Sequence, residues 1–95
     1  MRKYHKLKID YEFAFAKICG RKPFEIRKND RNFEVGDYIQ YEVNCSQDQK
    51  VLFKYFEEDV YEIEYITNYA QVDNYVVFSE KRLVGLGSNV VLKMD

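Results

Sequence analysis

The segment GRKPFEIRKNDRNFEVGD, residues 20–37, carries five basic and four acidic side chains in one continuous block. Its FEIRK portion alternates apolar and charged residues, which is the pattern of a β-strand buried on one face. We expect Phe24 and Ile26 to turn into the core, and Glu25 and Arg27 to project together from the opposite face. The block therefore predicts either a solvated surface segment or the rim of a site that binds an anion.

Strand and helix patterns surround this charged block. Residues 4–9, YHKLKI, alternate in the manner of a first strand. Asp10 then suits a helix N-cap, apolar residues recur at helical spacing from Tyr11 to Cys19, and Gly20 follows as a helix stop. Further strands are expected at residues 38–43, 51–56, 59–66, 74–78 and 89–94, a polar loop at 44–49, and turns at 29–32, 36–37 and 85–88.

This order of elements predicts an α+β fold. One main N-terminal helix and about seven short strands favour a domain built around a small β-barrel. The 95 residues include nine Tyr, seven Phe and a single Pro, which is the composition of a compact globule. We expect residues 1–95 to form one domain.

Charge is distributed unevenly along the chain although the net charge is −1. Residues 1–31 hold ten Lys and Arg against four Asp and Glu, whereas residues 32–95 hold five against twelve. Such asymmetry indicates a basic face that attracts phosphate-bearing partners, unless the two parts of the chain interleave in space and cancel.

Several functional classes find no support in the sequence. Cys19 and Cys45 match no zinc-ligand spacing, and one His in the whole chain leaves a zinc site without ligands, so no metal and no cofactor is predicted. The basic N-terminus lacks the apolar stretch of a secretory signal, and no apolar run approaches the ~20 residues that span a bilayer. We expect a cytoplasmic protein with reduced thiols and no membrane partner.

Three segments resemble a small bacterial and phage family in the ASCH division of the PUA-like superfamily. They are HKLKI, the charged block, and YITNYAQVDNYVVF. The most specific pattern is G-x-K-x-x-E-x-R followed by V-G-D, represented here by Gly20, Lys22, Glu25, Arg27, Val35, Gly36 and Asp37. The resemblance implies a PUA-like β-barrel whose first helix and following strand border a cleft. In that superfamily the cleft is generally proposed to bind RNA or a nucleotide, although many members of this family have no established activity.

The resemblance and the residue types together predict a binding module for RNA or a nucleotide. Lys22, Glu25 and Arg27 would meet at the cleft, where Arg27 can hold a phosphate bidentately and Glu25 can select among bases. The basic residues expected to attract a nucleic-acid backbone are Lys6, Lys8, Arg21, Lys22, Arg27 and Arg31. The alternative is that Glu25 and Arg27 form an ordinary surface ion pair.

His5 has two interpretations. It shares a face of the first strand with Leu7 and Ile9, so a buried, hydrogen-bonded histidine is one reading. The other places His5 at the mouth of the cleft as a donor to the ligand.

The resemblance also implies an enzymatic alternative, because some small ASCH proteins are amidohydrolases that remove acyl groups from modified cytidine nucleosides. Their catalytic lysine corresponds to Lys22, but their threonine three residues later is Glu25 here. Glu25 would then have to activate water directly, with Glu62 or Glu64 as the additional carboxylate. A third possibility, suggested by the phage relatives, is a protein that docks on a host protein.

Overall fold

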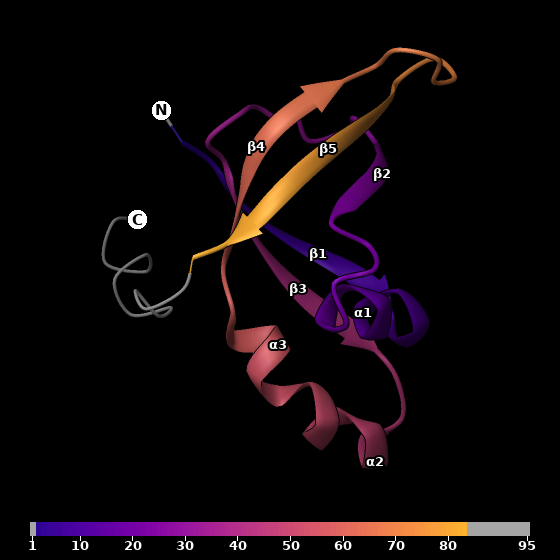
Figure 1. Cartoon of the computed structure of the whole chain (residues 1–95), viewed down its shortest axis with the longest axis vertical. Helices are drawn as coiled ribbons and strands as arrows, with labels where there is room; N and C mark the ends of the chain where they lie inside the picture. The colour runs from indigo at the N-terminus through magenta and orange to yellow at the C-terminus, as the bar shows by residue number, and fades with distance from the viewer. Residues whose placement is uncertain (1, 84–95) are drawn as a thin grey trace.

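The computed structural model describes residues 2–83. Five strands and two helical regions follow one another along this part of the chain (Figure 1). Their bounds are β1 Tyr4–Asp10, α1 Tyr11–Ile18, β2 Phe24–Lys28, β3 Tyr38–Asn44, α2 Gln47–Lys50, the 3-10 turn Val51–Phe53, α3 Lys54–Glu58, β4 Tyr61–Thr67 and β5 Tyr75–Arg82. The α+β class predicted from the sequence is therefore confirmed.

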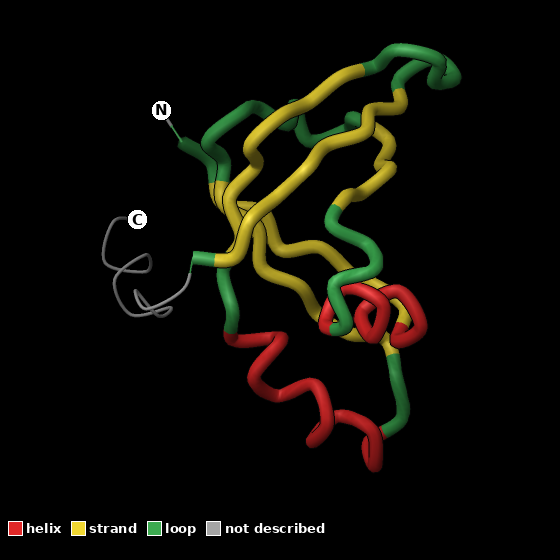
Figure 2. Tube along the Cα trace, in the orientation of Figure 1, coloured by secondary structure: helices red, strands yellow, loops and turns green. Residues whose placement is uncertain are grey.

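The five strands form one curled sheet in the order β1-β3-β4-β5-β2. β1 pairs with β3 in parallel, and the other three pairs are antiparallel. The sheet curls into a half-barrel with β1 and β2 as its two edge strands, and the helical segments gather at the end opposite the β4–β5 loop (Figure 2). This barrel-like shape brings β1 and β2 close together, although they lie at opposite ends of the sheet order.

Alternating side chains fill the inside of the curl. Leu7 and Ile9 of β1 are buried beside Tyr41 and Val43 of β3, in the register of the parallel pair. Phe53 and Phe56 are buried from the helical side, and Ile63 and Phe78 come from β4 and β5. Helix α1 adds only Ala14 to this core, because Phe13, Phe15 and Ile18 are each about half exposed.

The predicted faces of β2 are wrong. Glu25 is only 2% exposed, while Phe24 and Ile26 are 39% and 52% exposed. The strand lies where residues 24–28 predicted it, but the carboxylate points inward and the apolar residues point outward. A buried carboxylate requires compensating charges, and these come from elements distant in the sequence.

The region between β3 and β4 was also predicted wrongly. Instead of a loop at 44–49 and a strand at 51–56, the chain forms α2, a 3-10 turn and α3. The Ser46 side chain accepts the backbone N–H of Gln49, and the Gln49 side chain accepts the backbone N–H of Ser46. This capping box starts the helical run, and the burial of Phe53 and Phe56, three residues apart, holds it against the sheet.

Other local predictions hold within the described residues. Helix α1 follows Asp10, although the Asp10 side chain makes no capping hydrogen bond, and Gly20 lies just past the helix with φ +75°. The tight turn at Gly36 is confirmed, since Gly36 has φ +92° and Asp37 donates its N–H to Glu34 O at 3.1 Å. The predicted turn at 85–88 and strand at 89–94 lie outside the described residues.

Candidate functional site

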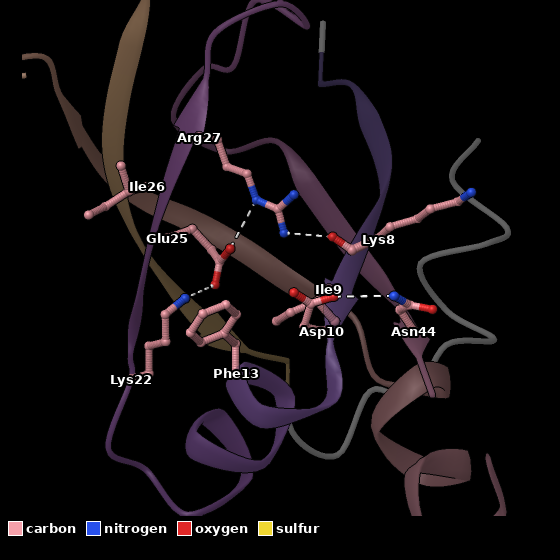
Figure 3. A pocket seen from close by; sticks show the side chains of 9 residues that line it. All are labelled: Lys8, Ile9, Asp10, Phe13, Lys22, Glu25, Ile26, Arg27 and Asn44. Carbon is pink, nitrogen blue, oxygen red and sulfur yellow. Dashed lines mark hydrogen bonds and ion pairs between the residues drawn. The ribbon is translucent and has the colours of Figure 1, made fainter. Parts of the chain in front are cut away.

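A cleft of about 590 Å³ opens between β1, the start of α1, and β2. Figure 3 shows Phe13, Lys22, Glu25 and Arg27 facing the cleft, whereas the side chains of Lys8 and Ile26 extend away from its centre. Its lining includes Lys8, Phe13, Lys22, Glu25, Ile26 and Arg27. The cleft thus lies at the seam of the half-barrel, between the two edge strands.

Glu25 organises the inner wall of the cleft. Its Oε2 lies 2.7 Å from Lys22 Nζ and 2.9 Å from Lys17 Nζ, and its Oε1 accepts Arg27 Nε–H at 3.0 Å. The side chains of Lys22 and Arg27 remain 21% and 25% exposed. A single buried carboxylate therefore holds two cations at the cleft surface (Figure 3).

Arg27 also ties the two edge strands together. Its Nη2 donates to the backbone carbonyl of Lys8 at 3.0 Å, from β2 across to β1 (Figure 3). A guanidinium has five N–H donors, and Arg27 uses two of them on Glu25 and Lys8. Three donors are left for a ligand, since no other partner of Arg27 occurs among residues 2–83.

A second ionic layer lies under Glu25. The Lys17 side chain is 3% exposed and pairs with Glu80 as well as with Glu25. Lys17 Nζ also donates to the carbonyls of Lys22 and Phe24, each at 3.2 Å, while the Tyr41 hydroxyl lies 2.6 and 2.7 Å from the two oxygens of Glu80. Within this layer Lys17 gives Glu25 a buried cationic partner, in addition to Lys22 and Arg27 at the cleft surface.

The two carboxylates have opposite pKa shifts. Burial alone would raise the pKa of Glu25, but the charges and hydrogen bonds of Lys17 and Lys22 outweigh it and lower that pKa. Burial raises the pKa of Glu80, and the nearby Glu25 charge raises it further, against Lys17 and Tyr41. The pKa of the Tyr41 hydroxyl is raised by burial and by both carboxylates. Glu25 is thus the carboxylate held in its anionic form, and Glu80 is the one that takes up a proton more readily.

A scan of protein families matches residues 4–79 to a family described as a domain of unknown function, DUF3850. The chain belongs to this DUF3850 family. The match includes every side chain that lines the cleft, together with Lys17 and Tyr41, and ends one residue before Glu80. A comparison with curated proteins gave no match.

In this DUF3850 protein the cleft collects some of the residues predicted from the sequence. Lys8, Lys22, Glu25 and Arg27 lie on it together. A neighbouring hollow, named here the basic groove, is lined by Lys6, Lys8, Arg27, Lys28, Asp30 and Arg31, with two apolar residues. Arg21 is exposed and lines neither hollow.

His5 is not brought to the cleft. It is buried, its Nε2 lies 2.9 Å from Asp37 Oδ2, and its ring packs against Phe33 at a centroid distance of 4.8 Å. This is the first of the two interpretations of the sequence, and the placement of His5 at the mouth of the cleft is wrong. The predicted auxiliary carboxylates are also elsewhere, because Glu62 pairs with Arg2 at 2.9 Å and Glu64 is exposed.

Sequence reasoning missed Lys17, Tyr41 and Glu80. Lys17 resembles an ordinary lysine in the last turn of a helix, and Glu80 follows an apolar strand. The available signal was the alternation in β5, where Val76, Phe78 and Glu80 share one face and are all buried. A charged residue in register with a buried apolar face indicates a partner charge inside the fold.

The structure also bears on metal binding and on membrane-spanning helices. Among residues 2–83 no group of three or more His, Cys, Asp or Glu is placed to hold a metal ion. No helix in that same stretch has the length and apolar character needed to cross a membrane. Cys19 and Cys45 are both free thiols. RNA, nucleotide and host-protein partners stay predictions.

Proposed function

We propose that the cleft binds RNA or a nucleotide, with the ligand's phosphate held by Lys22 and Arg27. The observation that carries this proposal is the buried Glu25, which fixes both cations at the cleft surface while they stay partly exposed. Such pre-positioned cations lose little side-chain freedom when an anion arrives. Arg27 has the planar donor set that matches phosphate oxygens, and Lys22 adds a point charge.

The charge of the cleft supports an anionic ligand. Four cations line the cleft or lie just beneath it, against three carboxylates, so cations outnumber anions even when every carboxylate is ionised; the cations are Lys8, Lys17, Lys22 and Arg27, and the carboxylates are Asp10, Glu25 and Glu80. Because Glu80 has a raised pKa, protonation of Glu80 makes the site more positive still. The balance favours a phosphate over a cationic or neutral ligand.

The apolar wall of the cleft suits a nucleobase. Phe13 and Ile26 are each about half exposed, and both line the cleft. An unpaired base can stack on an exposed aromatic ring while its phosphate meets the cations beside it. Lys22 Nζ already lies 5.1 Å from the Phe13 ring centroid, so the aromatic wall and the phosphate-binding group are adjacent.

The contacts of Glu25 do not favour the role expected from the sequence, which was the selection of a base. Its two oxygens already accept contacts from Lys17, Lys22 and Arg27. We therefore assign Glu25 to the positioning of the cations rather than to the selection of a base. The resemblance of GRKPFEIR and VGD to the ASCH and PUA-like pattern supports the same class of ligand, because that superfamily is generally proposed to bind RNA or nucleotides at this cleft.

Fluorescence anisotropy at low salt tests the proposal. Labelled RNA is titrated with the wild type, with Arg27→Ala, and with Lys54→Ala as a control that removes an exposed lysine from α3. Loss of a charged hydrogen-bonding group at the ligand is worth about 1.5–3 kcal/mol, so Arg27→Ala is expected to weaken binding roughly 10–100-fold. The control is expected to bind like the wild type. A wild type that binds no better than an unrelated acidic protein would refute the proposal.

Amide hydrolysis of acylated nucleosides is the second candidate. It is favoured by the pair Glu25 and Glu80, two buried carboxylates whose pKa values move in opposite directions around one shared Lys17. In this reading water adds its hydroxide to the acyl carbon, the bond to the nucleoside amine breaks, and the amine takes the proton. Lys22 and Glu25 would be the catalytic groups, with Glu80 as the second carboxylate.

Incubation with an acylated cytidine, followed by chromatography, tests this candidate. Release of the free nucleoside by the wild type, and its loss in Lys22→Met, is the expected result. No product after prolonged incubation of folded wild type would remove the enzymatic reading and leave the binding proposal untouched.

A further inference from the structure

The basic groove continues directly from the cleft. Lys8 and Arg27 line both hollows, so one wall passes from one to the other without a break. Beyond Arg27, the end of β2 supplies Lys28 and the loop that follows supplies Arg31. From Glu25 to Lys28 the strand advances roughly 10 Å, at about 3.3 Å per residue, which is longer than a single phosphate group.

Cations dominate this groove. Five basic side chains line it, and Asp30 is its one acidic residue. Within residues 2–83, Lys8, Lys28 and Arg31 make no ion pair, in contrast to Lys22 and Arg27, which share Glu25. The groove therefore holds positive charge that the protein itself does not neutralise.

The loop that presents Arg31 is anchored at both ends. Asn29 donates its backbone N–H to Asn74 O, and its side-chain Oδ1 accepts the N–H of Phe33 at 2.9 Å. Phe33 is buried, with its ring 5.2 Å from that of Phe78. Between these anchors Asn32 has φ +52°, which turns the chain sharply. Arg31 thus stands on a short loop with a fixed base, directly beside the exposed end of β2.

We propose that the basic groove is a second phosphate subsite and that the ligand is a single-stranded oligonucleotide. This rests on the proposed function: an unpaired base enters the cleft beside Phe13, and the backbone then passes Arg27 to reach Lys28 and Arg31. A mononucleotide would leave the groove empty. A duplex keeps its bases stacked and paired, so it cannot place one in the cleft without paying to extrude it.

The test compares ligands of different length. Fluorescence anisotropy is measured with a labelled mononucleotide, with single-stranded RNA and DNA of about eight nucleotides, and with a duplex of the same length; about eight nucleotides is within the range of small binding modules. The proteins are the wild type, the double variant Lys28→Ala with Arg31→Ala, and the double control Lys54→Ala with Lys81→Ala, which removes the same charge outside both hollows. Each affinity is measured over a series of salt concentrations.

The expected pattern separates the two subsites. The wild type should bind the oligonucleotide at least about tenfold more tightly than the mononucleotide. The groove variant should lose most of that advantage and keep the mononucleotide affinity. Each phosphate contact contributes about 0.7 to the slope of log affinity against log salt for single strands, so the variant's slope should fall by about 1.4. Equal binding of RNA and DNA supports a subsite that recognises the phosphates alone, whereas a preference for RNA supports the same subsite with added contacts to the 2′-hydroxyl.

Three results would overturn the second subsite alone. One is equal wild-type affinity for mononucleotide and oligonucleotide, another is a duplex that binds as tightly as the single strand, and the third is a groove variant with an unchanged salt slope. If neither the mononucleotide nor the oligonucleotide binds, the proposed function itself fails. This result is distinct from those that overturn the second subsite, because in them at least one ligand still binds.

Discussion

Two buried carboxylates in this protein, Asp37 and Glu25, are satisfied in different ways. Asp37 accepts the backbone N–H groups of Lys3 and Glu34, each at 3.0 Å, contacts His5 Nε2 at 2.9 Å, and lies 3.9 Å from the Lys3 ammonium. Glu25 meets only side-chain cations, two of which reach the surface of the cleft. Burial would raise the pKa of both groups, yet their partners lower it in each case.

The two carboxylates differ in how many hydrogen-bond donors their partners have left for other groups. Backbone amides fixed in a turn have no donor left to offer, so Asp37 serves to hold the β2–β3 connection against β1. Lysine and arginine side chains have several donors, and a carboxylate that takes one or two of them leaves the rest pointing at solvent. The backbone partners of Asp37 thus have no donor to spare, whereas the cations around Glu25 keep donors that the proposed ligand could use.

The largest effect on stability is expected from Asp37→Ala. The substitution leaves two backbone N–H groups and the His5 ring without their acceptor in a buried place, so the free energy of unfolding should fall by about 3–5 kcal/mol. Urea unfolding followed by circular dichroism measures the loss. A fall of less than about 1 kcal/mol would mean that water replaces the carboxylate, and the contrast with the cleft would then disappear.

Asp37→Asn serves as the isosteric companion to that variant. The folded-state pKa of Asp37 is lowered, so its charge stabilises the fold above its unfolded value of about 3.9, and this contribution is lost as the pH falls through the folded value. The difference in unfolding free energy between the wild type and Asp37→Asn should therefore shrink as the pH is lowered below about 3.9. A difference that stays constant down to that range would assign the effect to shape rather than charge.

Much of the fold was readable from the sequence because it depends on local patterns. Alternation located β1, β2 and β3, and Gly36 marked the turn before Asp37. The helical run from α2 to α3 was missed because Val51, Phe53 and Tyr55 resemble a strand, although Ser46 and Gln49 already carried a capping box.

The burial of Glu25 and its pairing with Lys17 could not be predicted from local patterns. Alternation states that Phe24 and Glu25 lie on opposite faces of β2, but not which face is inside. The usual preference for apolar burial gave the wrong answer, because Lys17 of helix α1 compensates the buried charge of Glu25 and is itself shared with Glu80 of the distant strand β5. The alternation in β5 indicates that Glu80 is buried, but only the tertiary fold brings Lys17, Glu25 and Glu80 together, so no local window of sequence identifies the partners.

Lys17→Met is expected to have an intermediate effect. Loss of the buried ammonium leaves Glu25 and Glu80 facing each other, which should cost about 2–4 kcal/mol of unfolding free energy. The loss is smaller than for Asp37→Ala because Glu80 can take up a proton, its pKa being already raised by burial. Lys22 and Arg27 continue to neutralise Glu25.

The pH dependence of that variant has a definite sign. A carboxyl whose folded-state pKa is raised stabilises the fold below its unfolded value of about 4.3, and this contribution is lost as the pH rises through the folded value. Lys17→Met should therefore be destabilised more at neutral than at mildly acidic pH. Equal losses at both would show that Glu80 does not take up the proton.

The smallest effect on stability is expected from Arg27→Ala, although it should weaken RNA binding the most among these variants. The Arg27 side chain is 25% exposed, and Glu25 keeps Lys17 and Lys22 as partners when Arg27 is removed. Partly exposed ion pairs contribute about 0–1 kcal/mol, so urea unfolding should show a loss within that range. A loss as large as that of Asp37→Ala would mean that Arg27 holds the two edge strands together as a structural group. A small loss of stability with a large loss of affinity is the combination that separates a cation kept for a ligand from one kept for the fold.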